Sequence, residues 1–161
     1  MTTFTITRIF DAPRPVVFDC WTNADHMVKW LSPKGSKASM ISSDIRPGGF
    51  NHVCITSPDG TKHYGKYTYK EISPVEKIVY VNAFADAEGN LIHHPMSPSW
   101  PLELLTTVTL KDIGERTELT LTWDPIDASD EEIATFMQSL DGCTIGWGGA
   151  FDTLDEYLQT T

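Results

Sequence analysis

The sequence lacks any apolar run approaching the roughly 20 residues that a membrane-spanning helix needs. Its first residues show no charged segment followed by an apolar core, so we expect no secretory signal and a cytoplasmic protein. Cysteine is scarce: Cys20, Cys54 and Cys143 are odd in number, distant from one another and never arranged as Cys-x-x-Cys. This pattern predicts reduced thiols and argues against a disulfide framework or a structural zinc site.

Positive charge is absent from the last part of the chain. Residues 117–161 hold 10 acidic residues and no Lys or Arg, whereas residues 1–116 hold 12 acidic and 12 basic residues. Because nucleic acids and anionic lipid surfaces attract basic clusters, we expect no nucleic-acid partner and no membrane partner. The acidic segment predicts a solvated helix face, and as a contact surface it would suit a basic protein.

The remaining composition is typical of one globular domain, which we place at residues 1–161. Of these 161 residues, 40% are hydrophobic and 21% are charged, which is sufficient for a single core. Residues 3–10 alternate between apolar and polar side chains, as expected for a strand. Two short helices should follow, because Pro13 suits a first helical turn and Thr22 suits a helix N-cap.

Between residues 36 and 125 the apolar period becomes two, with turn sequences such as Ser57-Pro58-Asp59-Gly60 between the segments. This pattern predicts six short antiparallel strands. Ser129 then begins a capping box and a helix, which we expect Gly142 to end. A final helix with one apolar face is predicted from about Thr144 to Tyr157.

The hairpin turns predict which side chains face the interior of the sheet. If Thr56 pairs with Thr61, then His52 and Cys54 share one face, and Lys62 with the later lysines lies on the other. Since the lysines favour water, the first face should be buried. With the aromatic residues of later segments, this face predicts a ligand site. The residues assigned to it are His52, Cys54, His63, Tyr67, Tyr69, Tyr80, Asn82, Phe84, Trp100, Trp123, Met137, Leu140, Trp147 and Phe151.

This interior contains more polar atoms than a close-packed core tolerates. Each buried polar group without a partner costs about 1–3 kcal/mol. A cavity that admits water or a ligand therefore explains the imidazole, phenol and amide groups. The alternative is that these groups satisfy one another in a solid core.

His52 is the strongest catalytic candidate, because an imidazole in such an interior could shuttle a proton to an enolisable ligand. The alternative is a buried histidine that bonds to a tyrosine. Cys54 lies about 6–7 Å away along the same strand, too far for a nucleophile and its base. The adjacent His93 and His94 point to opposite sides of an extended segment, so we predict neither a metal site nor a cofactor.

The segment from Pro95 to Glu103 contains three prolines, which stiffen the loop that carries Trp100. We interpret this loop as a lid or rim of the ligand site. The alternative is a rigid connector whose tryptophan fills the core.

Short motifs occur in a characteristic order along the chain. They include Phe10-Asp11-Ala12-Pro13, Lys29-Trp30, Ile45-Arg46-Pro47-Gly48-Gly49, Ser57-Pro58-Asp59-Gly60 and Gly146-Trp147. In this order they resemble the START and SRPBCC superfamily of helix-grip proteins, in the branch named after the activator of the ninety-kilodalton heat-shock protein ATPase. Further motifs, above all His94-Pro95-Met96-Ser97-Pro98-Ser99-Trp100, resemble a narrower bacterial subgroup. That subgroup usually has a bulky aromatic residue where this chain has Val53, which we expect to face outward together with Asn51.

The resemblance implies an α+β fold in which an antiparallel seven-strand sheet wraps around a long C-terminal helix, with two short helices after the first strand. It also implies an apolar pocket between sheet and helix. Our leading hypothesis is that this pocket binds a small hydrophobic or aromatic ligand. The alternatives are a chaperone-regulating interaction module and an enzyme of cyclase or hydrolase type that uses His52. Such a sheet also has a free edge, through which two copies of the chain could form a homodimer.

Overall fold

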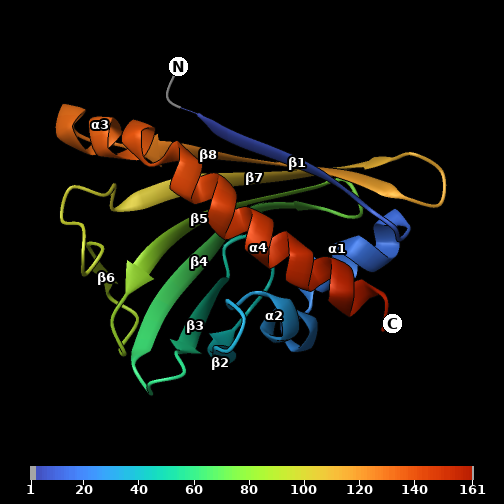
Figure 1. Cartoon of the computed structure of the whole chain (residues 1–161), viewed down its shortest axis with the longest axis horizontal. Helices are drawn as coiled ribbons and strands as arrows, with labels where there is room; N and C mark the ends of the chain where they lie inside the picture. The colour runs from blue at the N-terminus through green and yellow to red at the C-terminus, as the bar shows by residue number, and fades with distance from the viewer. Residues whose placement is uncertain (1–2, 161) are drawn as a thin grey trace.

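The computed structural model describes residues 3–160, which form an α+β fold (Figure 1). Its elements in chain order are β1 (Phe4–Phe10), α1 (Arg14–Thr22), α2 (Ala24–Trp30), β2 (Lys37–Ser43), β3 (Phe50–Thr56), β4 (Lys62–Ser73), β5 (Lys77–Ala85), β6 (Leu91–Ile92), β7 (Glu103–Asp112), β8 (Thr117–Ile126), α3 (Asp130–Gln138) and α4 (Leu140–Leu158). No helix within residues 3–160 is long and apolar enough to cross a membrane.

One antiparallel sheet organises the molecule. Its strand order is β1-β8-β7-β5-β4-β3-β2, and the short β6 pairs with β5 outside this path. Figure 1 shows α4 running diagonally across one face of the curved sheet, with α1 and α2 beside the C-terminal end of the helix. The predicted fold, a seven-strand sheet wrapped around a long helix, is therefore confirmed, with β6 as a small addition.

The core lies between the inner face of the sheet and α4. Alternate residues of the strands, such as Leu119 and Leu121 of β8, are fully buried, as the period of two predicts. From α4, Phe151 and Leu154 are equally buried, and the ring of Phe151 meets that of Phe10 edge-on at 5.5 Å. These contacts fix the height of α4 above the sheet.

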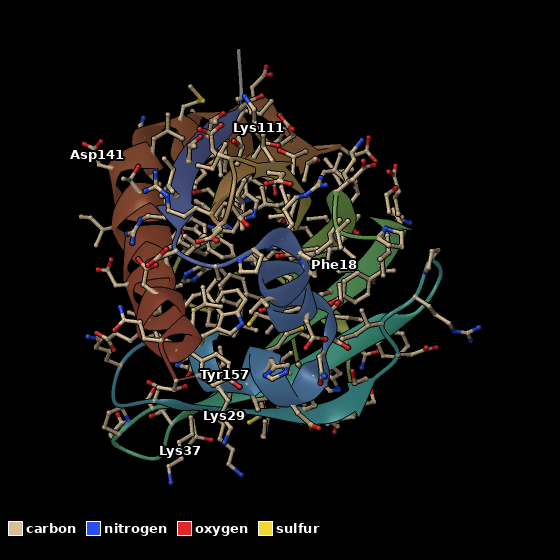
Figure 2. All side chains as sticks on the ribbon, turned by 90° about the vertical axis from the view of Figure 1, so that its right-hand side faces the viewer. Phe18, Lys29, Lys37, Lys111, Asp141 and Tyr157 are labelled. Carbon is tan, nitrogen blue, oxygen red and sulfur yellow. The ribbon has the colours of Figure 1, made fainter. Side chains whose placement is uncertain are left out.

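Polar contacts attach the C-terminal end of α4 to the short helices. The hydroxyl of Tyr157 lies 2.6 Å from Nδ1 of His26 in α2. The other ring nitrogen of His26 lies 3.0 Å from a carboxylate oxygen of Asp19 in α1. Figure 2 shows Tyr157 at this end of α4, next to α2, and Asp141 pointing outward near the opposite end.

Two helix boundaries differ from the sequence prediction. The N-cap of α2 is Asn23, whose side chain accepts a hydrogen bond from the backbone N–H of Asp25, whereas the Thr22 hydroxyl donates to Phe18 inside α1. The capping box at Ser129 is confirmed. The predicted break at Gly142 is wrong, since α4 begins at Leu140 and continues through this glycine. A glycine costs a helix only about 1 kcal/mol, which tertiary packing offsets.

The register of the first hairpin also differs from the prediction. Thr56 pairs with Lys62, not with Thr61. Gly60 adopts a φ of 88°, so Pro58 to Gly60 form a three-residue loop that Ser57 and Thr61 close. This loop shifts the pairing by one residue, and a shift of one residue turns every side chain of β3 to the opposite face.

In β3, therefore, the predicted inward and outward sets are exchanged. Asn51 and Val53, which the sequence placed outside, are fully buried, and Ile55 lines the pocket described below. His52 and Cys54, which the sequence placed inside, lie on the outer face, opposite Lys66 and Tyr64 of β4 respectively. The inward assignment of these two residues is wrong.

Candidate functional site

A pocket of about 770 Å³ lies between the inner face of the sheet and α4. Its sheet wall includes Tyr67 of β4, Asn82 and Phe84 of β5, Leu104 of β7 and Trp123 of β8. This volume falls within the range of about 300–1,000 Å³ that small-molecule sites occupy.

The helix wall of the pocket consists mainly of small residues. Ser139, Cys143, Gly146 and Ala150 line it and recur with helical spacing, so they form one stripe along α4. A Cβ atom added at Gly146 would meet no atom within 4 Å. The pocket therefore exists because this stripe carries too little volume to fill the space under the helix. The spacing of these small residues is visible in the sequence. The prediction, however, used the large apolar residues of the helix, such as Trp147 and Phe151, to define the ligand site.

The sheet wall carries polar groups that the described residues leave unpaired. The hydroxyl of Thr106 donates to Oδ1 of Asn82 at 2.5 Å, which leaves the amide nitrogen of Asn82 without a partner among residues 3–160. The hydroxyl of Tyr67 has no hydrogen bond within the same part of the chain, and Nε1 of Trp123 is buried there without a partner. The wall thus offers three hydrogen-bond donors to an occupant.

Three tyrosines lie together behind and beside this wall. The ring of Tyr80 is 5.3 Å from that of Tyr67 and 5.6 Å from that of Tyr69. Burial raises the pKa of Tyr67 to about 12, and it raises the pKa values of Tyr69 and Tyr80 as well. All three phenols are consequently neutral at physiological pH. Tyr67 lines the pocket, whereas Tyr69 and Tyr80 belong to the packed core.

Imidazoles and the proline-containing loop border another part of the pocket. His63 and His94 both line it, and the ring of His94 packs against Phe84 at 4.6 Å. Burial lowers the pKa of His94, and the nearby His63 lowers it further. Nδ1 of His94 accepts a hydrogen bond from the backbone N–H of Met96 at 3.0 Å, which requires the neutral ring at that nitrogen.

Trp100 has both of the roles that the sequence left open. Its side chain lines the pocket, and its ring also packs against Phe136 at 5.5 Å and against Trp123 at 6.3 Å. The loop is attached to α3 by a hydrogen bond of 2.7 Å from the Thr135 hydroxyl to the Ser99 hydroxyl. The loop therefore forms a fixed rim and not a separate flap.

The structure divides the predicted site residues into two groups. Those that line the pocket are His63, Tyr67, Asn82, Phe84, Trp100, Trp123 and Trp147. Those that do not line it are His52, Cys54, Tyr69, Tyr80, Met137, Leu140 and Phe151. Tyr69, Tyr80 and Phe151 are buried in the core, Leu140 packs against the core, and Met137 is exposed on α3.

His52 is occupied elsewhere. Its Nε2 lies 3.0 Å from the backbone carbonyl of Asp86, in the turn between β5 and β6 that covers it, and only 4% of the residue is exposed. Since a carbonyl only accepts, Nε2 carries the proton and donates. The strongest catalytic candidate of the sequence is thus a buried, hydrogen-bonded histidine, as the alternative interpretation had it, but it bonds to a turn on the outer face of the sheet and not to a tyrosine.

Metal-binding arrangements do not occur among the described residues. Within residues 3–160 no group of three or more His, Cys, Asp or Glu side chains lies close enough to hold a metal ion.

Comparison with known proteins identifies the family. Residues 11–159 match the family model described as "Activator of Hsp90 ATPase homolog 1-like protein". The chain belongs to this family. As an Activator of Hsp90 ATPase homolog 1-like protein it is similar in structure to Protein Ms6760 from Mycobacterium smegmatis, with 25% identity and a TM-score of 0.80 over 99% of this chain and 92% of that one.

Two further solved structures show the same fold. A protein from Arthrobacter aurescens has 24% identity and a TM-score of 0.82 over 99% of this chain and 87% of its own. Protein CV1439 from Chromobacterium violaceum has 24% identity and a TM-score of 0.75 over 98% and 96% respectively. Comparison with curated proteins finds no match. For this member of the family, regulation of a chaperone stays a prediction.

Proposed function

We propose that this protein binds a small hydrophobic or aromatic molecule in the pocket between the sheet and α4. The observation that carries the proposal is the pocket itself, about 770 Å³ in volume and bordered by the rings of Tyr67, Trp100, Trp123 and Trp147. An apolar, aromatic lining favours burial of a ligand surface at about 25 cal/mol per Å². The small residues of α4 support the same conclusion, because a helix that only closed a core would fill this space with larger side chains.

Binding is the activity that the site supports best. The imidazole that the sequence offered as a proton carrier, His52, lies on the outer face and donates to Asp86. Of the imidazoles that do line the pocket, His94 already uses Nδ1 to accept from Met96. We therefore propose a carrier or sensor of its ligand.

A thermal-shift screen with neutral hydrophobic compounds tests this function, using two matched glycine variants. Gly146 lines the pocket, whereas Gly149 lies on the same helix outside the lining, and a Cβ at either position meets no atom within 4 Å. We expect Gly146→Leu to lose the stabilisation by ligands that the wild type and Gly149→Leu retain. Both variants replace a helical glycine, so both should gain about 1 kcal/mol of intrinsic helix stability.

Either of two results would contradict the proposed function. One is that no neutral hydrophobic compound stabilises the wild-type protein. The other is that compounds stabilise Gly146→Leu as strongly as they stabilise the wild type, since the ligand would then bind outside the pocket.

A further inference from the structure

The sheet wall of the pocket presents unpaired hydrogen-bond donors. The Asn82 oxygen already accepts from the Thr106 hydroxyl, whereas the N–H groups of its amide have no partner within residues 3–160. Trp123 Nε1 is buried without a partner in the same part of the chain, and an indole nitrogen donates only. Tyr67 adds a hydroxyl that can donate and that has no hydrogen bond among the described residues. An occupant that supplies acceptors would satisfy these groups.

Two of these donors belong to neighbouring side chains. Tyr67 of β4 and Asn82 of β5 are directly paired across the antiparallel strands. Side chains at such paired positions lie on the same face of a sheet, with Cβ atoms about 4.5–5.5 Å apart. Both side chains line the pocket, so both are available to an acceptor of an occupant.

The lining of the pocket, within residues 3–160, has no permanently charged side chain, which disfavours a ligand with an ionised acceptor. Among the described residues that line the pocket there is no Lys, Arg, Asp or Glu. Burial also raises the pKa of Tyr67 and Cys143 and lowers the pKa of His94, which favours the neutral form of each of these groups. A carboxylate entering the pocket would lose hydration and find no Lys or Arg in the described lining to pair with, which is unfavourable.

The remaining walls favour a flat ring system. The rings of Trp100 and Trp123 meet at 6.3 Å, and those of Trp123 and Trp147 meet at 5.7 Å. Phe84 and His94 close another side. Aromatic faces and edges of this kind pack best against another aromatic ring.

We propose that the pocket selects a neutral, flat aromatic ligand with a carbonyl oxygen, and that this oxygen accepts hydrogen bonds from Tyr67 and Asn82. This inference rests on the proposed function, because it assigns a ligand class to the same pocket. Hydrocarbons of the same shape bind more weakly, since they leave both donors unpaired. Aromatic carboxylates bind more weakly still.

Three anthracene derivatives of matched shape test the ligand class: acetylanthracene, ethylanthracene and anthracenecarboxylate. Binding is measured at pH 7.5 by energy transfer from the pocket tryptophans to the anthracene ring. We expect acetylanthracene to bind about tenfold more tightly than ethylanthracene, which corresponds to two ordinary hydrogen bonds. Anthracenecarboxylate should show no saturable transfer. Equal affinity of ethylanthracene and acetylanthracene, or tight binding of the carboxylate, would overturn the inference and leave the proposed function standing. If none of the three produces transfer, the inference fails, and the thermal-shift screen decides separately whether the proposed function stands.

A pair of tyrosine variants tests the assigned donor. Tyr67→Phe removes a hydroxyl of the pocket lining, whereas Tyr157→Phe removes a hydroxyl outside the lining, at the C-terminal end of α4. We expect Tyr67→Phe to weaken acetylanthracene about fivefold and to leave ethylanthracene unchanged. Tyr157→Phe should change neither affinity. A Tyr67→Phe protein that folds, as judged by its circular dichroism and thermal transition, and binds acetylanthracene as tightly as the wild type overturns the assignment of this oxygen.

Discussion

The side-chain amide of Asn51 donates a hydrogen bond of 3.0 Å to the hydroxyl of Tyr69, joining β3 to β4 through the core. Asn51 is completely buried. Its oxygen accepts from the Ser43 hydroxyl of β2 at 2.7 Å, and its nitrogen also approaches Sδ of Met27 in α2 at 3.6 Å. One amide therefore links three strands and a helix near the β2 edge of the sheet.

Removing the hydroxyl of Tyr69 should destabilise the protein. In Tyr69→Phe, the buried amide of Asn51 loses its oxygen partner, and an unpaired buried donor costs about 1–3 kcal/mol. We expect urea denaturation to show a decrease of this size in the free energy of unfolding. Tyr67→Phe is the matched control, because its hydroxyl has no partner among residues 3–160 and its loss should change stability by less than about 0.5 kcal/mol. Equal stability losses in the two variants would contradict the role assigned to Asn51.

Replacing His52 should affect stability and not ligand binding. His52→Phe removes one of the two donors to the Asp86 carbonyl, which still accepts from the backbone N–H of Gly89 at 3.1 Å, so we expect a loss of about 1 kcal/mol. The pocket lies on the other face of the sheet, so the energy transfer to acetylanthracene should keep the affinity of the wild type. If the His52→Phe protein keeps its fold but loses this binding, the conclusion that His52 lies outside the ligand site is wrong.

The sequence predicted the element types and the sheet faces well where alternation was strong. On β7 and β8, buried residues such as Leu104 and Leu121 alternate with polar ones, and no choice of turn is needed to assign their face. A four-residue turn from Ser73 to Glu76 predicts that Tyr69 lies opposite Tyr80, and this pairing is confirmed. The turn behind the prediction differs, however. Ser73 pairs with Lys77 across a loop one residue shorter than expected, and a bulge at Lys70 restores the register.

No such compensation exists at the first hairpin, and this explains the error at His52. The positive φ of Gly60 makes a three-residue loop out of a sequence that also suits a four-residue turn. On β3 both faces are substantially buried: Val53 by the core, and His52 by the turn after β5. A local pattern cannot indicate which buried face borders a pocket, because the covering turn comes from a segment more than thirty residues later in the chain.

Arg8 should hold β1 to α4 in a salt-dependent manner. Its guanidinium lies 2.8 Å from Asp152 and 2.7 Å from Asp155, on consecutive turns of the helix. We expect Arg8→Met to lower the free energy of unfolding by about 1 kcal/mol at low salt, less as the salt concentration rises. Lys34→Met is the control, because Lys34 and its partner Glu156 are both largely exposed and should contribute almost nothing. Equal effects of the two substitutions at low salt would contradict a stabilising role for the ion pairs of Arg8.

His94 should make the protein less stable below neutral pH. Burial and the nearby His63 lower its pKa from the ordinary value of 6.5, so the unfolded chain binds a proton at a higher pH than the folded protein does. The stabilising contribution is therefore complete above about pH 7.5, and it declines as the pH falls through 6.5 towards the folded pKa. His94→Asn offers a test, because its side-chain oxygen can still accept from the Met96 N–H, as Nδ1 does, without titrating in this range. Between about pH 7.5 and 5.5, the free energy of unfolding should fall less in His94→Asn than in the wild type, as measured by urea denaturation at each pH. Identical slopes in the two proteins would show that His94 takes up its proton equally well in the folded and unfolded states.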